Sequence, residues 1–214
     1  MPDEAVNVYD IIYRGGIVMW PIMATSVAAL AIIVERFFSL RRATIDTREF
    51  MDTMRSLLRQ GRIQESIEIC DEARTPISRV VKAGLLKAGR SKADIREAIE
   101  DTGRLEAPRL ERYLTALGTC AHIAPLLGLL GTVQGMIKAF AQIQHKQGIV
   151  SPSDLAEGIG NALITTAAGL VVAIPALVMY HYFVSRVDNM VLEMEVSSNE
   201  LVELLTKERS EYEV

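Results

Sequence analysis

The stretch GIGNALITTAAGLVVAIPA, from Gly158 to Ala176, is long and apolar enough to lie within a membrane, yet it carries three polar side chains close together. It belongs to an uncharged run that extends to Val184, in which His181 is the only ionisable side chain. About 20 helical residues cross the ~30 Å hydrocarbon layer of a bilayer. The stretch therefore predicts a transmembrane helix that holds polar groups at membrane depth.

Two further apolar runs have the length of a membrane span. Residues 17–38, IVMWPIMATSVAALAIIVERFF, carry no charge before Glu35, and the run that starts at residue 113 carries none before Lys138. A cleaved signal peptide starts with a basic region and has a shorter apolar core, whereas this chain starts MPDEAVNVYD. We therefore expect the first run to stay in the protein. The three runs predict an all-α membrane protein with three transmembrane helices.

Basic residues are distributed unevenly around these runs. Sixteen of the 23 Lys and Arg residues lie between Arg41 and Arg112, while only Arg14 precedes the first run and only Lys146 separates the second from the third. Because Lys and Arg concentrate in cytoplasmic loops, we expect the middle segment and the C-terminal tail inside the cell and the N-terminus outside. The predicted order is an outer N-terminus (1–16), transmembrane helix 1 (17–38), a cytoplasmic helical segment (39–112), transmembrane helix 2 (113–143), a short outer loop (144–156), transmembrane helix 3 (157–184) and a cytoplasmic C-terminal helix (185–214).

The cytoplasmic segment predicts a series of short amphipathic helices with recognisable ends. Gly61 and Gly89 are expected to end two of them. Thr75, followed by Pro76, and Ser91 are expected to begin the next two, because a hydroxyl side chain caps a helix and proline suits its first turn.

Helices two and three are expected to extend beyond the membrane. An apolar pattern from Leu105 runs into the second span, with a bend near Pro108, and the third helix is expected to start near Pro152. The tail after Arg186 carries apolar residues at spacings of three and four, which is typical of a helix that packs against others. We therefore expect both long helices to join a cytoplasmic helical bundle.

Composition and motifs argue against an enzyme or a metalloprotein. The formal net charge of −4 gives no sign of nucleic-acid binding. Cys70 and Cys120 are far apart in the sequence and are expected to be reduced packing residues, and His122 beside Cys120 lacks a third metal ligand. The sequence contains no phosphate loop and no nucleophile elbow. We expect no catalytic residues, no metal and no cofactor.

Small residues in the second and third spans predict close helix packing. The second span contains APLLGLLGTVQGMIKAF at residues 124–140, in which two glycines form a GxxxG pair. Small residues let helix backbones approach closely in lipid, and a proline frees a backbone carbonyl and can bend the helix. The candidate helix-packing residues are Gly128, Gly131, Gly135, Gly169 and Pro175.

Polar side chains in the same two spans predict a polar path. Asn161, Thr165 and Gly169 recur every four residues on one face of the third span, with Thr166 beside them. Thr132 lies next to the glycine face of the second span. Polar groups at membrane depth usually face a bundle interior or a water-filled path. Buried threonines also commonly bond to their own preceding turn, so packing alone remains an alternative for Thr132.

These segments, together with ERFFSL after the first span, resemble the MotA/TolQ/ExbB proton-channel family, most closely its ExbB/TolQ branch. The resemblance covers nearly the whole chain. It implies a bacterial inner-membrane subunit, with a periplasmic N-terminus and a cytoplasmic C-terminus, that assembles as a homopentamer around a dimer of single-span ExbD/TolR-like proteins. It also implies that ion flow past an aspartate of the partner drives mechanical work on periplasmic or outer-membrane proteins. A TonB/TolA-like protein is a candidate for such a partner.

The resemblance assigns roles to individual residues. Thr132 matches the threonine of the LLGTV motif and Thr166 that of the ALxTTA pattern, and both are expected to face the ion path. Asn161 stands where ExbB and TolQ sequences typically have a glutamate, and an asparagine cannot take up or release a proton. Three explanations stay open: the partner's aspartate is the only ion carrier, oxygens of Asn161, Thr132 and Thr166 bind sodium, or the residue was introduced by engineering.

The leading hypothesis is a subunit of a motor driven by the proton motive force, serving TonB-type transport or a Tol-like envelope function. One alternative is a sodium-driven version of the same motor. Another is a passive membrane scaffold, whose glycine and threonine faces only hold helices together. The candidate ion-path residues are Thr132, Thr166, Asn161 and Thr165.

Overall fold

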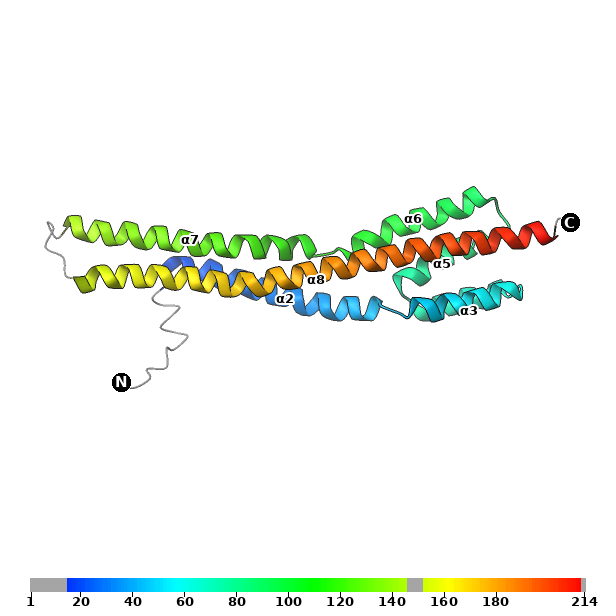
Figure 1. Ribbon diagram of the computed structural model, residues 1–214, viewed down its shortest axis with the longest axis horizontal. Helices are drawn as coiled ribbons and strands as arrows, with labels where there is room; N and C mark the ends of the chain where they lie inside the picture. Colours follow the sequence, from blue (N-terminus) through cyan, green and yellow to red (C-terminus); the bar gives the residue numbers. More distant parts are fainter. Residues whose placement is uncertain (1–14, 146–151, 213–214) are drawn as a thin grey trace, which may run out of the picture. The chain divides into compact units, whose positions relative to one another are not determined.

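The computed structural model of the chain describes residues 15–145 and 152–212, and every regular element in them is helical. In chain order these are the short 3₁₀ helix η1 (Gly16–Val18) and the α-helices α2 (Met19–Ala43), α3 (Thr47–Arg59), α4 (Ile63–Ala73), α5 (Pro76–Leu85), α6 (Lys92–Leu110), α7 (Leu114–His145) and α8 (Pro152–Tyr212) (Figure 1). For these residues the prediction of an all-α chain is confirmed.

Three helical stretches of the described chain are long and apolar enough to cross a membrane. They contain α2, α7 and the first part of α8, and an apolar window of 18 residues in each has a mean hydropathy of 2.3, 1.6 and 2.2 respectively. This confirms the prediction of a membrane protein with three spanning helices. The third of these helices begins at Pro152, in agreement with the start expected from the sequence.

The chain divides into two compact units, which are described separately. The membrane unit comprises Met1–Glu35 and Tyr113–Tyr182, and so contains most of α2, all of α7 and the first part of α8. The extramembrane unit comprises Arg36–Arg112 and Phe183–Val214, and so contains the end of α2, the helices α3 to α6 and the second part of α8. Two helices, α2 and α8, therefore contribute to both units.

The helix that leads into the second span differs from the sequence prediction in one detail. A continuous helix with a bend near Pro108 was expected, but α6 runs through Pro108 and ends at Leu110, and α7 begins at Leu114. Tyr113 between them has a φ of 64°, in the left-handed region that non-glycine residues rarely adopt and that commonly ends helices. An apolar pattern does not reveal such a break, because the spacing of apolar residues continues across a short turn.

The ends of the extramembrane helices follow the signals in the sequence. Thr75 and Ser78 form a capping box at the start of α5, and Ser91 and Asp94 form one at the start of α6. Gly61 follows α3 with a φ of 71°, which glycine adopts without steric penalty. The helix ends predicted at these positions are confirmed.

The core of the extramembrane unit is apolar and consists of the stripes that the sequence pattern indicates. Gly84 of α5 allows a close approach, since a Cβ atom there would lie 2.8 Å from Ile99 of α6 and 2.7 Å from Leu201 of α8. Burial of apolar surface, at about 25 cal/mol per Å², stabilises this arrangement. The buried side chains include Phe50, Met51, Met54, Leu57, Leu58, Ile77, Val80, Val81, Leu85, Ile95, Ile99, Val187, Met190, Met194 and Leu201.

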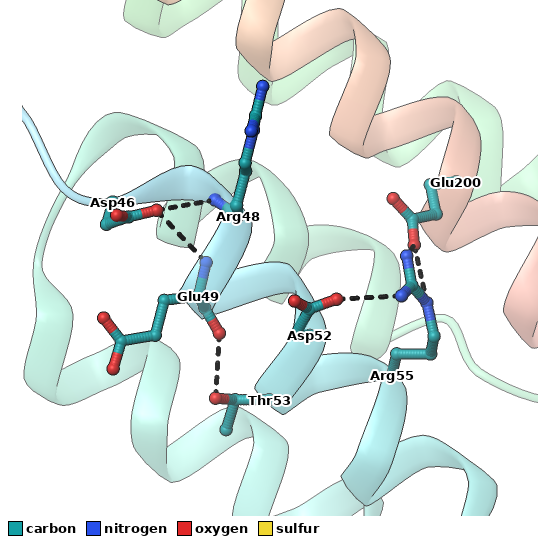
Figure 2. Close-up of polar contacts among 7 residues, drawn as sticks. All are labelled: Asp46, Arg48, Glu49, Asp52, Thr53, Arg55 and Glu200. Atoms are coloured by element: carbon teal, nitrogen blue, oxygen red, sulfur yellow. Dashed lines mark hydrogen bonds and ion pairs between the residues drawn. The ribbon is translucent and has the colours of Figure 1, made fainter.

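Polar contacts support α3 at its start and connect it to α8. Figure 2 shows Asp46 capping α3, where its carboxylate accepts a hydrogen bond of 3.1 Å from the Arg48 backbone N–H. Farther along the helix, Arg55 Nε donates to Glu200 of α8 at 3.0 Å and the same guanidinium pairs with Asp52 at 2.8 Å. Ion pairs that remain in contact with water contribute little to stability, so the apolar core accounts for more of it.

Candidate functional site

Small residues bring α7 and α8 into close contact in the membrane unit (Figure 1). A Cβ atom built on Gly128 would lie 2.9 Å from the carbonyl oxygen of Thr165, and one on Gly135 would lie 2.6 Å from Ala162 Cβ. One built on Gly169 would lie 2.6 Å from a backbone oxygen of α7. A methyl group at any of these positions would overlap its neighbour. The two backbones are therefore as close as glycine allows, which is how helices associate in lipid.

Gly131, also expected to serve helix packing, faces the side chain of Thr165. The contact further includes small residues that were not singled out in the sequence, since Gly158 faces Ala139, which is buried together with Ala162. The two alanines each follow a glycine by four positions, so the small-residue spacing could have identified them. Alanine is a common residue in apolar helices, and only the packing distinguishes these two from the others.

Three threonine hydroxyls at or beside this contact donate to backbone carbonyls. Thr165 is 1% exposed and donates to the carbonyl of the preceding turn at 2.6 Å. Thr166 donates across the contact to the Gly128 carbonyl at 3.1 Å. Thr132 donates to the preceding turn of α7 at 2.7 Å. Each bond uses the hydroxyl proton and leaves lone pairs of the oxygen as acceptors, which suit a cation or a protonated water molecule.

The face of α8 that was expected to line an interior path packs against α7. Thr165 and Gly169 are buried in the contact with α7, whereas Thr166 and Thr132 are half-buried. Pro175 is exposed, and α8 continues through it. Of these three candidate hydroxyls, therefore, those of Thr132 and Thr166 retain access to their surroundings within one chain.

A polar hollow of about 340 Å³ lies near the end of α7 and the beginning of α8, and the backbone of residues 15–18 closes one of its sides. Among its described lining residues, one side chain is charged, that of Lys138. In the sequence, Lys138 was noted only as the end of an uncharged run. The polar side chains of the hollow are Lys138, Gln134, Gln142, Asn161 and Thr165.

Of the four candidate ion-path residues, the hollow brings together Asn161 and Thr165 only. Thr132 and Thr166 do not line it, so the oxygens considered for a sodium site are not gathered in this space. Lys138, a cation, lines the same hollow and disfavours a second cation beside Asn161, because like charges repel. The hollow has instead the donor groups that suit an anion.

The side chains that could bind a metal or react as nucleophiles are dispersed. Among the described residues, no group of three or more His, Cys, Asp or Glu could hold a metal ion. His122 Nδ1 lies 2.6 Å from the Gly118 carbonyl, within its own helix. Burial raises the pKa of the Cys70 thiol to about 12, which makes it a poor nucleophile.

Comparison with known proteins relates this arrangement to a described family. The sequence model of the MotA/TolQ/ExbB proton channel family matches residues 72–196. The matched region includes α7 and most of α8, and thus the glycine contact and the threonine hydroxyls.

Individual relatives give the same result. The "putative biopolymer transport protein ExbB-like 1" of Synechocystis sp. is 36% identical over 189 residues, which are 85% of this chain and 72% of that protein. The "Tol-Pal system protein TolQ" of Haemophilus influenzae is 30% identical over 199 residues, 86% of each chain. An archaeal "putative biopolymer transport protein ExbB homolog" of Methanothermobacter thermautotrophicus is 28% identical over 209 residues, 95% of this chain and 72% of that protein.

The fold is also similar to a solved structure. The structure of C. jejuni MotAB aligns with a TM-score of 0.64 over 87% of this chain and 75% of that chain. The sequence identity is 16%, so this likeness concerns the fold alone.

Proposed function

Since the chain belongs to the MotA/TolQ/ExbB proton channel family, as an ExbB/TolQ-like member, we propose that it is the ion-channel subunit of a membrane motor driven by the proton motive force. The family consists of channel and energy-transduction subunits rather than enzymes. The proposed assembly is a homopentamer around a dimer of single-span ExbD/TolR-like proteins, and the proposed output is mechanical work on a TonB/TolA-like or other envelope partner. The proposed location is a bacterial inner membrane, with the extramembrane unit in the cytoplasm.

The observation that carries this proposal is the pair of half-buried hydroxyl oxygens at membrane depth. Thr132 and Thr166 donate their protons to backbone carbonyls and keep acceptor lone pairs. A protonated water molecule carries only O–H donors, so it needs such acceptors to cross an apolar layer. Polar side chains are costly at membrane depth, and those found there commonly serve an ion path or a packing contact.

The same geometry supports a partner that supplies an acid. Among the described residues, α7 and residues 158–182 of α8 contain no aspartate or glutamate, and Asn161 cannot titrate. Asp154 and Glu157 belong to the first turns of α8, so a proton path along the rest of these two helices needs a titrating group from elsewhere. An aspartate in the membrane helix of an ExbD/TolR-like partner meets this need.

Exposed apolar residues of α8 support assembly with other chains. Leu192 and Val196 are 57% and 60% exposed and belong to the extramembrane unit. They follow each other by four positions, so they share one face of the helix. Outside the lipid, an apolar face of this kind favours contact with another protein surface, and a second copy of the chain is the occupant proposed here.

Threonine substitutions test the ion path in the assembled complex. The full chain and its single-span partner are reconstituted in vesicles, and proton uptake is followed under an imposed gradient. We expect Thr132→Ala and Thr166→Val each to reduce uptake by about tenfold, the effect of about 1.4 kcal/mol on the transfer barrier. Thr119→Val is the matched control, because the Thr119 hydroxyl is exposed and also donates within α7, to the Thr115 carbonyl at 2.8 Å.

The same assay separates the alternatives. If uptake depends on external sodium at fixed pH, the driving ion is sodium rather than the proton. Unchanged uptake in both threonine variants, with the assembly intact, would contradict the proposed path, and absence of any flux from the wild-type complex would favour the passive scaffold.

A further inference from the structure

The polar hollow beside Asn161 has the composition of an anion site. Lys138 supplies an ammonium group with three N–H donors, and the Gln134, Gln142 and Asn161 amides supply further donors. No acidic side chain occurs among its described lining residues. A carboxylate at position 161, as the resemblance leads one to expect, would offset the charge of Lys138, and the neutral amide of asparagine does not.

The position of the hollow along the membrane normal indicates which kind of anion it could meet. The uncharged run at residues 113–137 rises about 37 Å at about 1.5 Å per residue, slightly more than the ~30 Å hydrocarbon layer. Lys138 therefore lies at the level of the lipid headgroups, at the end of the span away from Arg112. Trp20, 72% exposed in the first turn of α2, follows the segment that closes the hollow, and tryptophan favours the same level of the bilayer.

We propose that this hollow binds the phosphate group of a membrane phospholipid, held by the Lys138 ammonium and by the side-chain amides of Gln134 and Asn161. Phospholipid phosphates are the abundant anions at headgroup depth, and a phosphate offers several strong acceptor oxygens to such donors. The volume of about 340 Å³ admits a headgroup rather than only a monatomic ion. The site goes beyond the proposed motor function, because it requires the membrane position of the hollow but no ion flux.

Lipid binding to the purified full chain tests the proposal. The protein is delipidated in a mild detergent and titrated with phosphatidylglycerol, and bound lipid is counted by native mass spectrometry. We expect Lys138→Gln and Asn161→Glu each to weaken binding by about tenfold or more, because the first removes the cation and the second neutralises it. Lys138→Arg should retain binding, and Lys87→Gln, an exposed lysine of the extramembrane unit, is the matched control.

Each outcome of the lipid-binding experiment supports or contradicts the proposed lipid site. Equal lipid binding by the wild type and both weakening variants would overturn the proposal. Displacement of the lipid by inorganic phosphate at comparable concentration would assign the site to a soluble anion and would overturn the lipid assignment. If Lys138→Gln does not fold, Asn161→Glu and Lys138→Arg still decide the question. Lipid is counted without a gradient, so failure here is distinguishable from failure of proton uptake.

Discussion

Asn161 and Lys138 line the same hollow, in which Lys138 is the one charged side chain among the described lining residues, and a carboxylate at position 161 would offset that charge. The adjacent residues Thr165 and Thr166 have different surroundings. Thr165 is buried against α7 and donates within its own turn at 2.6 Å, with a longer contact of 3.4 Å to the Gly128 carbonyl. Thr166 is half-buried and donates across to the Gly128 carbonyl at 3.1 Å. At the scale of single residues, position on the helix face decides whether a hydroxyl serves packing or remains accessible.

Cys70 provides a probe of the folded extramembrane unit. Burial raises the pKa of its thiol from 9.0 to about 12, so at pH 8 roughly one molecule in ten thousand carries the reactive thiolate in the folded state. The stabilising effect of the neutral thiol is complete below about pH 9 and is lost as the pH rises toward about 12. In a Cys120→Ser background, we expect iodoacetamide to label Cys70 slowly at pH 8 and rapidly in urea, as measured by mass spectrometry. Rapid labelling without denaturant would contradict the buried position.

Glu106 is a buried acid whose removal should destabilise α5 and α6. Its side chain is 3% exposed and pairs with Arg79 of α5 and, at 2.6 Å, with Arg109. Both arginines retain contact with water, so we expect Glu106→Gln to cost about 1–3 kcal/mol rather than the full cost of a broken buried ion pair. Hydrogen exchange of the α5 and α6 amides in the full chain measures this loss.

An exposed acid on the same helix provides the control for that experiment. Glu100 is 54% exposed and lies 3.8 Å from Arg104, so Glu100→Gln should change the exchange free energy by less than about 0.5 kcal/mol. Equal effects of the two substitutions would show that burial of Glu106 does not determine its contribution.

The long helices α7 and α8 depend on glycine at their contact in the membrane unit. Local sequence signals are sufficient for the ends of α5 and α6, where capping boxes form within four residues. They are insufficient at Tyr113, whose left-handed conformation interrupts a continuous apolar pattern. At the scale of elements, the sequence predicts where helices begin better than it predicts a break within an apolar run.

Alanine substitutions test the helix contact. Gly128→Ala and Gly169→Ala would place a methyl group within 3 Å of backbone atoms of the facing helix, which cannot move aside as a flexible side chain can. We expect each to destabilise the full chain in detergent by about 1–3 kcal/mol, measured as a lower thermal unfolding midpoint. Gly160→Ala is the control, because no atom lies within 4 Å of its added Cβ and alanine is the better helix former. A midpoint lowered equally by all three variants would contradict the close-contact explanation.

The two units of the molecule place their apolar side chains differently because they meet different solvents. In the membrane unit, large apolar side chains such as Leu126, Phe140 and Val171 are 62%, 67% and 70% exposed, as expected where lipid is the solvent. In the extramembrane unit, the apolar stripes of α3, α5 and α6 are buried, and α5 packs closely against α6 and α8 at Gly84. At the scale of the whole molecule, the clustering of charge along the sequence already distinguishes these two environments.

The sequence by itself determined the all-α class, the three spanning helices and the helix ends around Thr75 and Ser91, because hydrophobic length and capping act over short distances along the chain. It also identified the family. Only the tertiary structure decided that Thr165 packs against α7 and that Lys138 shares a hollow with Asn161. These residues are far apart in sequence, and the close approach of two helices brings them together. Their chemistry therefore depends on packing that no local pattern specifies.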